Sequence, residues 1–317
     1  MNTITRDSVL VVGGGMMGSG IAAISALAGN PTIIVESSDQ ARATCPDRVF
    51  GLLDELAEND LISEEKMARA LGFISYQKDI ETQCGKAFFV IEAIIENLAA
   101  KQEIFSRLDT LLPASVPIVS NTSGLRITEI AQRTKHPERT VTAHFWFPAH
   151  LVPLVEVVMS DKTSPQIAAW VVDTLKSWGK APVLVKRDLP GQLANRILQA
   201  VIREASHIVE IGLASAEDVD TAVKMGMGIR FPVWGPLEHV DAVGVDLCNA
   251  VQNSVLPGIS DSHAANVPFA EMVARGDLGY KTGKGFYDWS VKDMPALAKL
   301  RNEFIIHALK KINEKKR

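Results

Sequence analysis

A glycine-rich turn near the N-terminus constrains the fold of this chain more than any other feature. The turn, Gly13-Gly14-Gly15-Met16-Met17-Gly18, follows a short apolar run at residues 9–12 and precedes small apolar residues at 19–28. A β-branched run at residues 32–35 comes next and ends at Glu36. Short apolar runs of this kind are typical of strands that are buried on both faces of a parallel sheet. The pattern therefore predicts a strand–helix–strand unit with a Gly-x-Gly-x-x-Gly turn at its first junction.

The spacing of the glycines predicts a dinucleotide site at this turn. Gly13 allows the tight turn, Gly15 lets the backbone approach a pyrophosphate, and Gly18 lets helix and strand pack closely. The N–H groups at the start of the helix, at Met16 and Met17, would face the phosphates. The alternative is a structural turn that binds nothing.

Glu36 predicts which dinucleotide is bound. It stands 23 residues after Gly13, at the end of the second predicted strand. A carboxylate there can accept hydrogen bonds from both ribose hydroxyls of NAD and would repel the 2′-phosphate of NADP. NAD is therefore the expected cofactor.

The alternation of strand and helix patterns continues to about residue 185, which predicts an α/β fold with a doubly wound, mainly parallel sheet. Beyond Asp188 the apolar residues recur at helical spacing, and the long segment at 193–211 is amphipathic. We therefore expect a Rossmann domain at residues 1–187. A smaller all-α domain for substrate binding and dimerisation is expected at residues 188–317.

The composition indicates a globular protein and argues against a nucleic-acid partner. Of the 317 residues, 47% are hydrophobic, and the formal net charge is −4, which disfavours binding to a polyanion. Cys45, Cys84 and Cys248 are few and widely separated, which predicts a reducing, cytoplasmic compartment without disulfides. No Cys/His spacing suggests a metal site, and no apolar run approaches membrane-spanning length. We expect neither a metal nor a membrane partner.

A second group of polar residues is suited to the oxidation of an alcohol. Ser123 follows a predicted strand, at the sheet edge where ligands of such folds bind. A histidine such as His144 can take the hydroxyl proton while hydride leaves for the nicotinamide, and Glu156 could hold its tautomer. Asn195, one turn into a predicted helix, could orient a substrate oxygen. From the residues alone, a structural role for His144 and a helix-start hydrogen bond for Asn195 stay open.

Together these pieces resemble the L-3-hydroxyacyl-CoA dehydrogenase family over nearly the whole chain, from Val9 to about Trp289. The matching stretches are residues 13–18, 91–98, 120–123, 144–145, 154–158, 190–191 with 195–196, 235–236 and 281–287. Their order and spacing together make the resemblance specific.

The resemblance implies a role for each candidate residue. His144 would be the catalytic base and Glu156 its catalytic partner, while Ser123 and Asn195 would contact the oxygens of the substrate. The residues expected on the cofactor side are Glu96, Asn97 and Asn121. The resemblance also implies a homodimer that forms through the helical domain.

The chain departs from the family pattern where a CoA thioester would bind. Members usually carry Asn three residues after the catalytic His, and this chain carries Phe147. Acyl-CoA members place lysines that reach the CoA phosphates on the helix after the second strand. Phe50 and Asp54 stand in those places here. Loss of charge-assisted phosphate contacts should weaken CoA binding.

Arg230, shortly before Gly235-Pro236, resembles the branch of the family that oxidises free 3-hydroxy acids: the L-gulonate and carnitine dehydrogenases and lambda-crystallin. An arginine there could pair bidentately with a substrate carboxylate. We therefore favour oxidation of a free L-3-hydroxy acid to the 3-oxo acid by NAD, or the reverse reaction.

Several alternatives stay open. One is a true 3-hydroxyacyl-CoA or 3-hydroxybutyryl-CoA dehydrogenase, and another is a pyridine-type hydroxymethyl or aldehyde acid dehydrogenase of the same family. A third is a non-enzymatic, crystallin-like NAD-binding protein. The 6-phosphogluconate-like enzymes share the N-terminal turn, but they use a lysine in the helix that enters the second domain. The helix here begins with Gln192, Asn195 and Arg196 instead.

Overall fold

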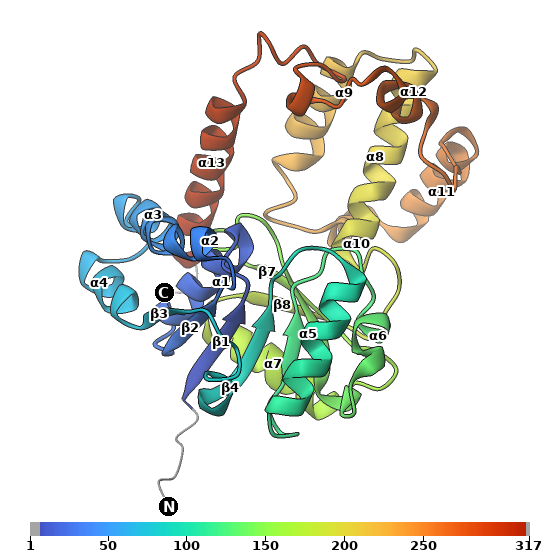
Figure 1. Cartoon of the computed structure of the whole chain (residues 1–317). Helices are drawn as coiled ribbons and strands as arrows, with labels where there is room; N and C mark the ends of the chain where they lie inside the picture. The colour runs from blue at the N-terminus through green and yellow to red at the C-terminus, as the bar shows by residue number, and fades with distance from the viewer. Residues whose placement is uncertain (1–6, 315–317) are drawn as a thin grey trace, which may run out of the picture. The chain divides into compact units, whose positions relative to one another are not determined.

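The computed structural model describes residues 7–314, except for the side chain at position 313. The chain divides into two compact units, the first ending at Ala194 and the second beginning at Asn195. The first is an α/β unit and the second is helical (Figure 1). The predicted fold class is thereby confirmed.

The first unit is built on one eight-stranded sheet in the order β3-β2-β1-β4-β5-β6-β7-β8. The strands are β1 (Ser8–Val12), β2 (Thr32–Val35), β3 (Ile74–Gln77), β4 (Ala87–Glu92), β5 (Ile118–Ser120), β6 (Thr140–Phe145), β7 (Leu154–Val158) and β8 (Ala181–Val185). The strands from β3 to β6 are parallel, β7 runs antiparallel to β6, and β8 is parallel to β7. The order changes direction at β1, where ligands of doubly wound sheets bind.

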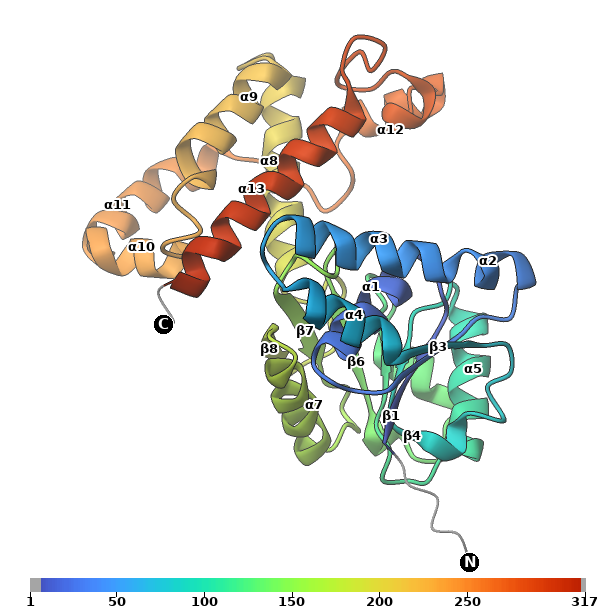
Figure 2. The same ribbon diagram turned by 90° about the vertical axis from the view of Figure 1, so that its left-hand side faces the viewer.

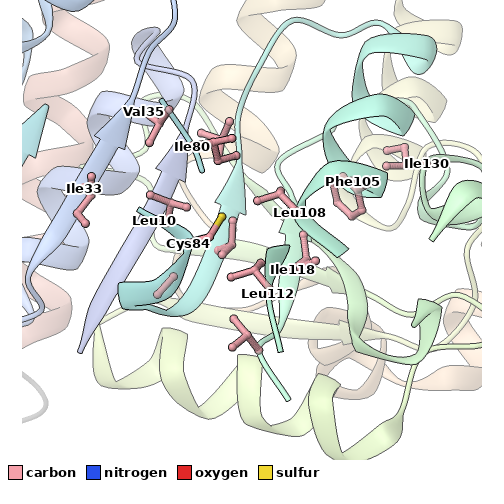
Figure 3. Close-up of a cluster of buried hydrophobic side chains, with 14 of the residues drawn as sticks. Leu10, Ile33, Val35, Ile80, Cys84, Phe105, Leu108, Leu112, Ile118 and Ile130 are labelled. Carbon is pink, nitrogen blue, oxygen red and sulfur yellow. The ribbon is translucent and has the colours of Figure 1, made fainter. Parts of the chain in front are cut away.

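Helices cover both faces of this sheet (Figure 2). They are α1 (Met16–Leu27), α2 (Asp39–Ala43), α3 (Cys45–Glu58), α4 (Glu64–Gly72), α5 (Leu98–Leu111), α6 (Ile127–Ile130) and α7 (Pro165–Ser177). On one face, Leu10 and Ile118 from the strands pack with Phe105 and Leu108 of α5 and Ile130 of α6 (Figure 3). This cluster fixes β1 and β4, whose carboxyl ends carry the glycine turn and the loop after Glu92.

Two local features carry little signal in the sequence. Residues 39–58 form two helices instead of one, because Pro46 occupies the first turn of α3, where its missing N–H leaves no hydrogen bond unmade. Strand β3 is the second such feature. It is a four-residue edge strand with only partly buried side chains, so it lacks the apolar run that marks β1 and β2.

The second unit consists of helices and short turns. Its elements are α8 (Ala194–Glu210, with its first residue in the α/β unit), α9 (Ala216–Ala222), the π-helical turn η4 (Val223–Gly228), α10 (Pro236–Val243), α11 (Val245–Val255), α12 (Val267–Arg275) and α13 (Met294–Glu314). Among its described side chains, only Ser206, Asn266 and Ile306 are buried. Within residues 7–314, no helix has the length and apolar character needed to cross a bilayer.

Candidate active site

A cavity of about 580 Å³ opens at the carboxyl ends of β1, β2 and β4. Gly13, Gly15 and Glu36 line it, together with the loop at residues 93–95. Gly13, Gly15 and Glu36 are three of the residues that the sequence assigned to the cofactor. The cavity lining does not include the others, which are Met16, Met17, Gly18, Glu96, Asn97 and Asn121. The cavity therefore lies where a dinucleotide binds in this class of sheet.

The glycines of the turn differ in the space around them. Gly13 and Gly18 are packed against backbone atoms, whereas Gly15 faces open space. Gly13 has a φ of 104°, and a Cβ built on it would lie 2.6 Å from the Ala93 carbonyl oxygen. A Cβ on Gly18 would lie 1.9 Å from the Gly13 oxygen. A Cβ on Gly15 would meet nothing within 4 Å, and Gly15 and Met16 are exposed while Met17 is half-buried. The turn thus has the shape of a cradle for the pyrophosphate of NAD.

Glu36 lies at the end of β2 with its carboxylate turned to the glycine turn. Its Oε2 accepts a hydrogen bond from the Gly14 N–H at 2.9 Å, and its Oε1 accepts one from the Ser38 N–H at 3.0 Å. The carboxylate is therefore fixed beside the cavity, where a ribose diol would reach it.

The three other residues predicted on the cofactor side hold loops in place. Glu96 Oε1 accepts from Thr122 Oγ1 at 2.6 Å and from the Ser123 and Gly124 N–H groups at 3.0 Å each. Burial alone would raise the pKa of Glu96, but these hydrogen bonds and Lys101 hold it below its usual value. Asn97 caps α5 by accepting from the Ala100 N–H, and Asn121 accepts from the Phe145 N–H.

A buried ion pair behind this loop was not singled out from the sequence. Lys101 Nζ lies 2.6 Å from Glu92 Oε1, and both side chains are fully buried. Glu92 also accepts from Ser120 Oγ at 2.6 Å and from the Ile94 N–H at 2.7 Å. Burial raises the pKa of Glu92, and the Lys101 ammonium opposes that rise. The only sequence signal is an acidic residue at the end of an apolar strand.

Glu92→Ala is expected to lower the free energy of unfolding by about 3–5 kcal/mol, because it removes one partner of a buried ion pair. Glu81→Ala is the matched control, since it breaks the exposed Arg107–Glu81 pair and should cost much less stability. Urea denaturation of both variants measures the difference. Equal losses of unfolding free energy in the two variants would show that the buried Glu92–Lys101 pair stabilises the protein no more than an exposed pair does.

The antiparallel register of β6 and β7 places His144 directly opposite Glu156. His144 Nδ1 lies 2.8 Å from Glu156 Oε2, and the two residues are 6% and 0% exposed. Because Nδ1 is used by the carboxylate, Nε2 is the ring nitrogen that can exchange a proton with a substrate.

Glu156 is held by three further donors. Trp146 Nε1 donates to Oε2 at 3.0 Å, and the Leu193 and Ala194 N–H groups donate to Oε1 at 2.9 and 2.8 Å. Burial would raise the pKa of Glu156, but the hydrogen bonds from His144, Trp146, Ala194 and Leu193 lower it to about 2. The carboxylate is therefore ionised at neutral pH and can stabilise a protonated imidazole.

Gln192 is a third residue to which the sequence analysis assigned no role. It has a φ of 54°, is 7% exposed, and donates from Nε2 to the Thr122 carbonyl at 3.1 Å. It thereby ties the Ser123 loop to the segment that holds Glu156. Ser123 itself is exposed beside Glu96.

The predicted site residues are divided between the two units. Ser123, His144 and Glu156 belong to the α/β unit, and hydrogen bonds through Gln192 and the backbone at 193–194 link their surroundings. Asn195 and Arg230 belong to the helical unit. Asn195 lies in the first turn of α8, and Arg230 is exposed just after η4, with its Nε donating to the Gly226 carbonyl.

Family models decide what kind of protein carries this site. The NAD-binding domain of 3-hydroxyacyl-CoA dehydrogenase matches residues 8–189, and the C-terminal domain of the same family matches residues 191–289. The chain belongs to the 3-hydroxyacyl-CoA dehydrogenase family. It is an NAD-dependent dehydrogenase that acts on a CH–OH group. The predictions of NAD and of an oxidoreductase are confirmed, and the 6-phosphogluconate-like alternative is excluded.

Relatives within this family act on different substrates. The mitochondrial hydroxyacyl-coenzyme A dehydrogenase of Sus scrofa is 37% identical over 292 residues, which cover 89% of this chain and 90% of the relative. The 5-formyl-3-hydroxy-2-methylpyridine 4-carboxylate 5-dehydrogenase of Mesorhizobium japonicum is 32% identical over 292 residues, covering 92% and 93%. A solved 5-formyl-3-hydroxy-2-methylpyridine 4-carboxylic acid 5-dehydrogenase, described as an NAD+-dependent dismutase, has a TM-score of 0.86 at 30% identity, covering 98% and 99%.

Proposed function

We propose that this dehydrogenase oxidises a small free acid of the pyridine-carboxylate type instead of a CoA thioester. The observation that carries the proposal is the charge on α3, the helix on which acyl-CoA members of the family place their phosphate-binding lysines. The TM-score of 0.86 with the pyridine-carboxylate dehydrogenase supports the same substrate class.

Helix α3 offers no cation to a CoA phosphate. It contains no lysine, and at the two corresponding places it carries Phe50, which is 49% exposed, and the half-buried Asp54. Its one cation, Arg48, donates from Nη1 to the Gly14 carbonyl at 2.5 Å and from Nη2 to Thr44 Oγ1 at 3.0 Å. An acidic helix whose arginine is already engaged would repel the phosphates of CoA.

The His144–Glu156 pair supplies the acid–base chemistry. An alcohol and a hydrated aldehyde both carry a C–H and an O–H on the same carbon. Imidazole Nε2 of His144 takes the hydroxyl proton while the C–H electron pair leaves as hydride, and Glu156 stabilises the imidazolium that forms. NAD, when bound, accepts that hydride. Ser123 and Asn195 orient the substrate oxygens.

Arg230 is the proposed partner of the substrate carboxylate, since a guanidinium can bind a carboxylate through two parallel hydrogen bonds. It is exposed in the helical unit. In the α/β unit, the half-buried Trp146 and the exposed Phe147 follow His144 and supply aromatic surface for a ring-bearing acid.

NADH formation across a substrate panel tests the proposal. The panel holds 5-formyl-3-hydroxy-2-methylpyridine 4-carboxylate, 3-hydroxybutyrate, L-gulonate, carnitine and 3-hydroxybutyryl-CoA. We expect the pyridine acid to give the highest kcat/KM, and Arg230→Ala to raise its KM by about tenfold. Arg275→Ala, an exposed arginine of the same unit that pairs with Glu271, is the control and should leave KM unchanged.

The second candidate is a 3-hydroxyacyl-CoA dehydrogenase, favoured by the 37% identity to the Sus scrofa enzyme and by a TM-score of 0.76 with 3-hydroxybutyryl-CoA dehydrogenase from Escherichia coli. The same panel separates the two. A kcat/KM on the CoA ester above that on every free acid, unchanged in Arg230→Ala, would overturn the free-acid proposal. A preference for L-gulonate or carnitine would keep the free acid and move the substrate to the non-aromatic branch.

We also propose that two copies associate through the helical unit. Its exposed side chains include Leu213, Val233, Leu237 and Phe304, each at least 61% exposed, whereas Ile306 is its one buried apolar side chain among those described. A helical unit that exposes so many apolar side chains and buries so few is expected to cover part of them against a second copy.

Analytical ultracentrifugation is expected to give a molecular mass of twice the chain mass of 34.4 kDa. Leu237→Glu should shift the protein toward the monomer, because it places a charge on the apolar surface of the helical unit. Leu184→Glu, on an exposed position of β8, should not. A wild-type protein that sediments at 34.4 kDa would contradict the proposal.

A further inference from the structure

Three charged side chains lie together just beyond the end of β2. Asp39 Oδ1 is 2.6 Å from Arg42 Nη2 and 3.3 Å from Lys78 Nζ. Arg42 and Asp39 belong to α2, whereas Lys78 follows β3, so the chain folding brings the two cations to one carboxylate. Arg42 first, and then Lys78, lower the pKa of Asp39, which is therefore ionised at neutral pH.

This cluster stands at the ribose end of the cofactor cavity. Lys78 lines the cavity together with Glu36 and Ser37. Arg42 Nη1 donates to the Glu36 backbone carbonyl at 3.0 Å, so its guanidinium is held beside the residue that faces the ribose. Lys78 is thus on the cavity wall and Arg42 lies beside Glu36, so two cations are close to the place of a phosphate on the ribose 2′-oxygen, although the chain is an NAD enzyme.

We propose that Asp39 is a determinant of cofactor specificity. The formal charges of Glu36, Asp39, Arg42 and Lys78 sum to zero. A 2′-phosphate would therefore meet two carboxylates, and Asp39 already accepts hydrogen bonds from both cations. Without Asp39 the same group carries +1. Arg42 Nη2 and Lys78 Nζ are then released for charge-assisted hydrogen bonds to a phosphate, while Arg42 Nη1 stays on the Glu36 carbonyl. Glu36 therefore excludes NADP by repulsion, and Asp39 excludes it by withholding Arg42 and Lys78.

Titration of the protein with NADH and NADPH, followed by nicotinamide fluorescence, measures this role without requiring the substrate. The wild type should bind NADH more tightly than NADPH. Asp39→Asn should tighten NADPH about tenfold and change the Kd for NADH by less than about twofold. Glu36→Gln should weaken NADH and tighten NADPH, and Glu36→Gln/Asp39→Asn should give the tightest NADPH binding of the series.

Two controls separate this role from a general charge effect. Asp47→Asn removes the same charge from an exposed position of the neighbouring helix α3, where Asp47 pairs with neither Arg42 nor Lys78, and it should leave both Kd values unchanged. Asp39→Asn/Arg42→Gln/Lys78→Gln should lose the gain in NADPH affinity. The proposal is overturned if Asp39→Asn tightens NADH and NADPH equally, matches Asp47→Asn, or keeps its gain without both cations. These measurements are independent of the substrate panel.

Discussion

Replacing His144 with alanine is expected to lower kcat about 10³-fold, within the range that a positioned general base contributes to catalysis. The physical reason is the loss of the only ring nitrogen that the Glu156 contact leaves for proton exchange with substrate. The Kd for NADH should stay within about twofold, because a catalytic base acts on the reacting hydroxyl instead of the bound dinucleotide.

His150→Ala is the control for this prediction. His150 is equally buried, lies on the connection between β6 and β7, and pairs with a carboxylate, Glu55 Oε2, at 2.6 Å. Burial lowers the pKa of His150, in spite of the Glu55 contact. Its loss should reduce stability but leave kcat close to the wild-type value. A His144→Ala enzyme with unchanged kcat on the best substrate of the panel would refute the proposed mechanism.

The parts of the site that sequence predicts well are local in the chain. The run at 9–12, the glycines of the turn and Glu36 lie within one strand–helix–strand unit, and each has a steric or electrostatic requirement that few residue types meet. The Cβ positions at Gly13 and Gly18, which would overlap backbone atoms, show why those two positions require glycine. The β2 bounds agree with the expected run at 32–35 for the same reason.

The parts that sequence misses depend on residues that only the fold brings together. Glu92 and Lys101 are nine residues apart and could be read as surface charges, but the end of β4 and the start of α5 bury both. Gln192 reaches Thr122 across 70 residues, and Lys78 reaches Asp39 across 39. Residue spacing carries no signal for such pairs. The substrate-contacting roles of Ser123, Asn195 and Arg230 stay predictions.

Glu156→Gln is expected to lower kcat about 10²-fold, because the amide keeps the shape of the carboxylate but cannot stabilise the imidazolium of His144. Glu156 acts through His144 and is thus a positioning residue. In His144→Ala/Glu156→Gln the second substitution should therefore add little to the loss in kcat. If the two losses multiply instead, Glu156 has an effect on the reaction that does not pass through the imidazole.

The dependence of stability on pH in the acid range independently tests the lowered pKa of Glu156. Its pKa falls from 4.5 to about 2 on folding, so the stability it contributes is complete above about pH 4.5 and is lost as the pH falls through 2. The difference in unfolding free energy between wild type and Glu156→Gln should therefore shrink between pH 5 and pH 2. Glu58→Gln, an exposed position on α3, should show no such trend. A constant difference would mean that the hydrogen bonds to Glu156 do not favour its ionised form.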